Sequence, residues 1–212
     1  MPGATSSETR GRLVEAATEF LRTRGVGDLS LRELAAGIGT SHRMLLYHFG
    51  SKDALLVEVA RDVEQRQRDA LAELLAEFDG DNAEELSRRF WRRLRAPDLA
   101  GLERLFFELY GRGLGGGADA SGLFEGVVES WIEAQVPLLA AAGLSEPEAR
   151  TQARLNVAVG RGLLLDVLAT GEERAVDAAY ELYLTALARL TEERGRKGRL
   201  RPAECSRRRG SA

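Results

Sequence analysis

The sequence has few of the residues from which most metal and redox centres are built. Of its 212 residues one is a cysteine, Cys205, and two are histidines, His42 and His48. A single cysteine excludes an intramolecular disulfide and a cysteine metal cluster. With both histidines in one N-terminal stretch, a histidine metal site is not expected either. We therefore expect neither a metal nor a cofactor.

Long hydrophobic runs are also missing. No stretch approaches the roughly 18 consecutive apolar residues that a transmembrane helix needs, so no membrane partner is expected. Residues 1–8 lack the basic and then apolar pattern of a secretory signal peptide. These two absences predict a cytoplasmic protein.

Charge is distributed unevenly along the chain. The net charge is −3, made up of +2 over residues 1–52, −12 over residues 53–193 and +7 over residues 194–212. This distribution suits a protein that presents one face to a polyanion and keeps the remainder away from it. The basic C-terminal segment is read as a disordered tail, with attraction to phosphates as an alternative role.

Residues 30–53 are predicted to form two short helices joined by a tight turn, followed by the start of a third helix. Ser30 and Glu33 have the spacing of a capping box, in which each residue bonds the other's backbone. Gly37 and Gly39 bracket the predicted turn, because glycine tolerates a positive φ angle. An apolar face follows at helical spacing: Leu31, Leu34, Ala35 and Ile38. This pattern is typical of a helix-turn-helix.

The second of these helices, at about residues 41–47, is predicted to carry the nucleic-acid face. Leu45 and Phe49 are expected to point inward. His42, Arg43 and Tyr47 are expected to point outward, with donors suited to phosphates and base edges. The next helix is capped by Ser51 and has Lys52 in its first turn, which favours a phosphate at its N-terminus. The alternative is an ordinary helical corner with solvated polar residues.

The segment Leu45-x-x-His48-Phe49-Gly50-Ser51-Lys52 resembles the most recognisable part of the DNA-binding head of the TetR (tetracycline repressor) family. The resemblance extends back to about Thr9. Leu46 departs from it, because the family usually has a phosphate-contacting tyrosine there, and Tyr47 is the candidate substitute. The resemblance and the outward face together give the following DNA-binding candidates: Arg32, Ser41, His42, Arg43, Met44, Tyr47, His48 and Lys52.

The remainder of the chain shows helical periodicity throughout, which predicts an all-α protein of about nine helices. Beyond the two short helices, the expected ranges are about 8–24, 52–78, 83–95, 98–112, 121–142, 145–169 and 173–193, with a surface loop over 111–117. We divide the chain into a helix-turn-helix DNA-binding domain at 1–52, a ligand-binding and dimerisation domain at 53–193, and the tail at 194–212.

Aromatic residues gather on the expected helices between residues 83 and 142. The resemblance implies an effector pocket there, with Trp91, Phe106, Phe107, Tyr110 and Trp131 as ligand-binding candidates. The alternative is that these aromatics form the core. The effector is expected to be a small hydrophobic or aromatic molecule of unknown identity. Candidate polar partners for it are Arg104, Glu108, Glu133, Gln135, Asn156 and Arg161.

The last two expected helices, at about 145–169 and 173–193, carry small residues and a wide apolar stripe. The resemblance implies a homodimer through them. The chain is therefore predicted to be a ligand-responsive repressor that binds a palindromic DNA operator as a homodimer. Two alternatives stay open: an architectural or partner-binding helical protein with a degenerate head, and a helical enzyme. We expect no enzyme, because the body contains no histidine and no serine in a nucleophile motif.

Overall fold

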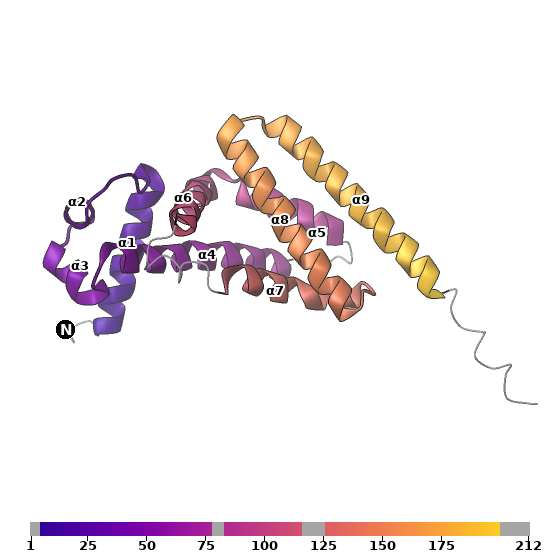
Figure 1. The fold of residues 1–212 in the computed structure, drawn as a ribbon, viewed down its shortest axis with the longest axis horizontal. Coiled ribbons are helices and arrows are strands. Elements are labelled where there is room, and N and C mark those ends of the chain that lie inside the picture. The colour runs from indigo at the N-terminus through magenta and orange to yellow at the C-terminus, as the bar shows by residue number, and fades with distance from the viewer. Residues whose placement is uncertain (1–4, 78–82, 116–125, 200–212) are drawn as a thin grey trace, which may run out of the picture. The chain divides into compact units, whose positions relative to one another are not determined.

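The structure, a computed structural model, describes residues 5–77, 83–115 and 126–199. In these three ranges the chain forms nine helices and no strand (Figure 1). The helices are α1 (Ser6–Arg24), α2 (Leu31–Gly37), α3 (His42–Phe49), α4 (Lys52–Glu77), α5 (Ala83–Leu94), α6 (Pro97–Leu114), α7 (Val127–Ala141), α8 (Glu146–Thr170) and α9 (Glu173–Arg199). The predicted all-α fold is confirmed. None of these helices is long and apolar enough to cross a bilayer.

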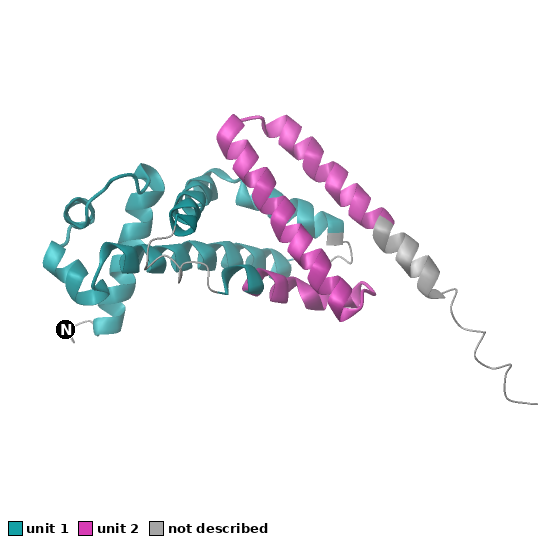
Figure 2. Ribbon diagram, viewed as in Figure 1, with its two compact units in different colours: residues 1–129 teal, residues 130–212 magenta. Residues whose placement is uncertain are grey.

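The chain divides into two compact units, residues 1–129 and residues 130–212 (Figure 2). The first unit holds α1 to α6, and the second holds α8, α9 and most of α7. The functional boundary that the sequence suggests at residue 52 lies inside the first unit, and it stays a prediction.

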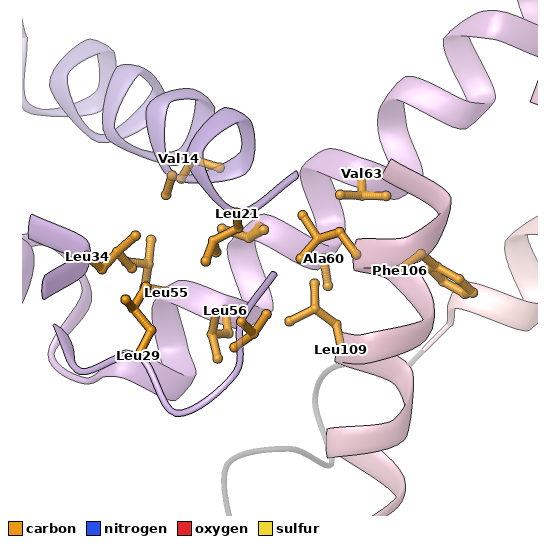
Figure 3. Close-up of a cluster of buried hydrophobic side chains, with 14 of the residues drawn as sticks. Val14, Leu21, Leu29, Leu34, Leu55, Leu56, Ala60, Val63, Phe106 and Leu109 are labelled. Carbon is orange, nitrogen blue, oxygen red and sulfur yellow. The ribbon is translucent and has the colours of Figure 1, made fainter. Parts of the chain in front are cut away.

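One hydrophobic cluster runs through the first unit from the N-terminal helices to α6. Figure 3 shows these side chains converging: Val14 and Leu21 from α1, Leu29 from the following loop, Leu34 from α2, Leu55, Leu56, Ala60 and Val63 from α4, and Phe106 and Leu109 from α6. Each fully buried leucine stabilises the folded state by about 1.5–3 kcal/mol relative to an exposed one. The helix-turn-helix therefore packs against α4 and belongs to the same core as α6.

Capping boxes begin three of the helices, and the one at Ser30 is the box that the sequence predicts. The Ser30 N–H donates to the Glu33 carboxylate at 2.8 Å, and the Glu33 N–H donates to the Ser30 hydroxyl at 3.2 Å. Thr5 and Glu8 make the same pair of bonds at the start of α1, so that helix begins at Ser6. A third capping box opens α8. Each box satisfies backbone donors that a helix N-terminus otherwise leaves unpaired.

Two helices extend further than expected. Helix α6 continues through Gly111 and Gly113 to Leu114, where the sequence suggests a loop. Glycine in a helix costs only about 1 kcal/mol relative to alanine, and the Gly115 N–H still donates to the Gly111 carbonyl at 3.2 Å. Helix α9 reaches Arg199, past the expected end at residue 193.

A polar network joins three helices of the second unit. The Asn156 amide of α8 donates to the Gln135 side chain of α7 at 2.8 Å. Gln152 donates to Asn156 at 2.8 Å and to the Tyr183 hydroxyl of α9 at 3.2 Å. Tyr183 in turn donates to Asn156. Burial raises the pKa of Tyr183 above its ordinary value, so its hydroxyl stays protonated as a donor at neutral pH.

Candidate nucleic-acid interface

Helices α2 and α3 are joined by four residues, 38–41, and this turn closes on the end of α2. The Thr40 N–H donates to the Ala35 carbonyl at 2.9 Å, and Gly39 has a φ angle of +70°. Leu45 and Phe49 of α3 are buried in the core, as predicted. This arrangement leaves the opposite side of α3 facing solvent.

Gly37 has a different role from the one expected. It does not adopt a positive φ angle, and it forms the last residue of α2. A Cβ atom built on Gly37 would lie 2.4 Å from the ring of Phe20 in α1. Gly37 is therefore needed for the close approach of α2 to α1, and only Gly39 supplies the positive φ of the turn.

The solvent-facing side of α3 combines donors with apolar groups. Arg43 and Tyr47 are spaced one helical turn apart and are both exposed, Tyr47 to 76%. Met44 and Leu46 flank them, and each is 40% exposed. Guanidinium and phenol groups donate to phosphates and base edges, while apolar groups can contact the thymine methyl.

The other predicted DNA-binding residues lie at the margins of this face. Arg32 is exposed on α2, and His42 and His48 are half-buried on α3. The His48 ring lies edge-on to the Tyr47 ring, with centroids 5.0 Å apart. Ser41 is the N-cap of α3, and its hydroxyl accepts from the Met44 N–H at 3.1 Å. Ser41 therefore stabilises the start of α3, whether or not it also contacts DNA.

The start of α4 forms a second potential phosphate contact. The Ser51 hydroxyl accepts from the Ala54 N–H at 3.0 Å, and Lys52 is the first residue of the helix. Hydrogen bonds from Ser30 keep the pKa of the Glu33 carboxyl below its ordinary value, aided by the charges of Arg24 and Lys52. A helix N-terminus with a lysine attracts anions, although the ionised Glu33 reduces the local positive potential.

Arg10 of α1 supports α3 from behind, a contact that the sequence does not suggest. Its guanidinium lies 5.0 Å from the centroid of the Phe49 ring and pairs with Glu58 of α4 at 3.0 Å. The partners are separated by 48 residues along the chain. One arginine thus joins the last residue of α3 to both α1 and α4.

The ligand-binding candidates lie in both units. In the first unit Trp91 and Phe106 are buried, and Phe107 and Tyr110 are partly buried. The Phe106 ring centroid lies 5.3 Å from that of Phe107 and 5.4 Å from that of Tyr110. Trp131 is buried in the second unit. Phe106, Phe107 and Tyr110 therefore belong to the packed interior of the first unit. That they bind a ligand stays a prediction.

Several of the candidate polar partners for a ligand are engaged within the protein. The Glu108 carboxylate accepts from two backbone N–H groups of the loop between α1 and α2. Glu133 pairs with Arg150 at 2.6 Å, and Gln135 and Asn156 bond each other. These side chains have structural bonds that their sequence positions did not reveal, because each partner is distant along the chain.

The N-terminal helices match a known family. Residues 13–59 match the model of the family described as bacterial regulatory proteins, tetR family. The chain thus has a TetR-family DNA-binding head. It is 33% identical over 82 residues to an uncharacterised HTH-type transcriptional regulator, YdgC, of Bacillus subtilis (strain 168). That match covers 39% of this chain and 42% of the relative, so it spans less than half of the relative's length.

Solved structures of TetR-family and related regulators match most of the chain. A TetR-family member from Streptomyces coelicolor A3 is 29% identical, with a TM-score of 0.64 over 85% of this chain and 98% of that one. The multidrug binding protein EbrR, complexed with imidazole, is also 29% identical, with a TM-score of 0.57 over 82% of this chain and 89% of that one. The expectation that the chain is not an enzyme is confirmed, because the TetR family consists of transcriptional regulators.

Proposed function

We propose that this TetR-family chain is a ligand-responsive repressor that binds a palindromic operator as a homodimer in the cytoplasm. The observation that carries the DNA-binding part is the exposed face of α3, where Arg43, Met44 and Tyr47 project next to the N-terminus of α4. A short helix with exposed donors at its N-terminal end suits the major groove. A mildly basic head on an acidic body orients that face toward DNA.

The dimer proposal rests on two exposed apolar stripes in the second unit. On α8 the stripe is Leu155, Ala158, Gly162 and Leu165, and on α9 it is Ala175, Ala178, Ala179, Leu182 and Ala186. The members of each stripe recur at helical spacing. Cβ atoms built on Gly160 and Gly162 would meet nothing within 4 Å. Small residues and exposed leucines on a helix face favour a second helix packed closely against it.

The effector proposal rests on the aromatic residues and on the relatives. Phe106, Phe107 and Tyr110 form an aromatic group on α6, and Trp91 lies on α5 of the same unit. EbrR, at 29% identity, is a multidrug binding protein. We propose a small hydrophobic or aromatic effector for this chain, which would favour a conformation with lower DNA affinity by binding it more tightly.

The DNA-binding proposal is tested by selecting duplexes from a random pool with the wild-type protein. We expect a palindrome whose half-sites are centred about 34–36 Å apart, or a multiple of that distance. Arg43→Ala is expected to weaken binding by about 1–3 kcal/mol and to relax the preference at one base pair. Lys52→Ala is expected to weaken binding to all sequences and to reduce the salt slope by about one.

Arg104→Ala is the matched control. Arg104 is exposed on α6 and carries the same charge as Arg43, but it lies outside the helix-turn-helix. This variant should bind the selected duplex as the wild type does. If all three variants bound equally well in a salt titration, the assignment of α3 and α4 to DNA would be wrong.

A further inference from the structure

Side chains of helix α6 bind the backbone of the loop that leads into the helix-turn-helix. Both oxygens of the Glu108 carboxylate are used: the Val26 N–H donates to one at 2.8 Å, and the Gly27 N–H donates to the other at 2.6 Å. One carboxylate thus receives two successive backbone donors. Charge-assisted bonds of this kind are about twice as strong as neutral ones.

The loop has a backbone that fits this carboxylate. Gly25 ends α1 with a φ angle of +76°, and its own N–H donates to the Leu21 carbonyl at 2.7 Å. A Cβ atom built on Gly25 would lie 3.0 Å from a Glu108 oxygen, a tighter contact than most side chains make. The side chain that follows, Val26, is buried in the core. The loop is therefore fixed from both its polar and its apolar side.

A second charged residue of α6 binds the same loop. Arg112, one helical turn after Glu108, donates from its guanidinium to the Gly27 carbonyl. The carboxylate binds the N–H of Gly27, and the guanidinium binds its C=O. We refer to Glu108 and Arg112 together as the α6 clamp.

Helix α6 is itself fixed to other parts of the first unit. Gln67 of α4 donates to Glu103 of α6 at 2.7 Å, and both side chains are buried. Near the start of α6, a Cβ atom built on Gly101 would lie 2.7 Å from Cγ of Arg22, so α6 and α1 approach closely there. Because α6 is packed in this way, a displacement of its C-terminal half, which carries Glu108 and Arg112, would also displace the loop before α2.

We propose that Glu108 and Arg112 are positioning residues that set the pose of the helix-turn-helix through the loop at residues 25–29. The pose then depends on α6 as well as on α4, which runs directly from α3. The expected effect on DNA binding rests on the proposed function. The expected effect on the loop is independent of it.

The first arm of the test measures amide exchange in the full-length protein. Glu108→Gln leaves one acceptor oxygen and turns an NH₂ group toward a backbone donor. We expect the Val26 and Gly27 amides to exchange at least about tenfold faster than in the wild type. The amides of the α2–α3 turn, at residues 38–40, should also exchange faster, and those of Val59 and Val63 in α4 should be unchanged. Glu73→Gln, which removes the same charge from an exposed position on α4, is the control.

The second arm measures affinity for a duplex that the wild-type protein selects from a random pool. A loosened head must be ordered on binding, so Glu108→Gln should bind about three- to tenfold more weakly. Its salt slope should be unchanged, because the phosphate contacts are the same. Arg112→Ala should weaken binding similarly, and Arg112→Lys should restore part of the loss. Glu73→Gln should bind as the wild type does.

The outcomes separate this inference from the proposed function. If the wild type selects no duplex, the proposed function fails, and the amide exchange of the loop and turn still decides whether the clamp positions the head. If the loop amides exchange faster while the α2–α3 turn and the DNA affinity are unchanged, the clamp holds only the loop and the inference is overturned. Unchanged exchange at Val26 and Gly27 overturns it as well.

Discussion

Met44 places an apolar side chain next to the hydrogen-bond donors Arg43 and Tyr47 on the exposed face of α3. Its N-terminal position on α3 is the one from which recognition helices reach base edges. The apolar group that the major groove offers is the thymine methyl. Leu46 is equally exposed, but it stands where the TetR family usually contacts the phosphate backbone. The two residues therefore make a matched pair for a test of base reading.

We predict that Met44 reads a thymine. Replacing that thymine by deoxyuridine removes one methyl group, which should weaken wild-type binding about fourfold at one position of the half-site. Met44→Ala should bind the thymine duplex more weakly than the wild type and should lose little more on this replacement. Fluorescence anisotropy with both duplexes measures the coupling. Leu46→Ala should keep the wild-type sensitivity, and an equal deoxyuridine loss in Met44→Ala and the wild type would contradict the prediction.

At the scale of elements, two glycines on α1 and α2 differ in their surroundings. Gly11 on α1 is exposed, and a Cβ atom there would meet nothing within 4 Å. Gly37 faces the Phe20 ring at a distance that leaves no room for a methyl group. The same substitution is thus expected to have opposite effects at the two positions.

We predict that Gly37→Ala lowers the free energy of unfolding by about 1–3 kcal/mol, the usual cost of overpacking. Gly11→Ala should raise it by up to about 1 kcal/mol, because alanine is the better helix former. Chemical denaturation of both variants measures the two changes. Equal effects would show that Phe20 moves away freely and that α2 does not depend on this close approach.

The ion pair between α1 and α4 predicts how stability depends on pH. The hydrogen bond from Arg10 holds the pKa of the Glu58 carboxyl below its ordinary value, with Arg61 also contributing, while partial burial opposes the shift. A carboxyl with a lowered folded-state pKa stabilises the protein above its unfolded pKa, and this contribution is lost as pH falls through the folded value.

Unfolding experiments between pH 7 and about pH 3 should therefore show a loss of stability that begins near the ordinary glutamate pKa of about 4.3. Glu58→Gln should be less stable than the wild type at pH 7, and the difference should shrink toward pH 3. Since Glu19 has a similarly lowered pKa, some acid sensitivity should remain in the variant. A difference that stayed constant across this range would mean that ionised Glu58 does not stabilise the fold.

The elements that the sequence predicts well are those set by neighbouring residues. The capping box at Ser30 and the inward positions of Leu45 and Phe49 depend on spacings of three or four residues. The contacts of Arg10 and Glu108 join positions 48 and 82 residues apart, and neither leaves a local pattern. The predicted end of α6 was wrong for the same reason. The glycines next to Arg112 suggest a loop, whereas the contact of Arg112 with the distant Gly27 carbonyl leaves no local pattern.

At the scale of the whole molecule, a palindromic operator requires two heads related by two-fold symmetry. The apolar stripes of α8 and α9 are the surfaces that we propose to bring two chains together. Leu182 on α9 is 71% exposed, and Leu114 at the end of α6 is 72% exposed. The two leucines are almost equally exposed but lie on different helices. The same substitution at each position therefore tests whether α9 in particular forms the interface.

We predict that Leu182→Glu converts the protein from a dimer to a monomer at micromolar concentration, because a carboxylate in the centre of a helix–helix interface would be buried without a partner. Leu114→Glu should leave the dimer intact. Sedimentation equilibrium measures both. The monomeric variant should also lose at least about tenfold in affinity for the palindrome, since its second half-site is no longer bound by a linked head. It should bind a single half-site as the wild type does. A dimeric Leu182→Glu protein would place the interface elsewhere.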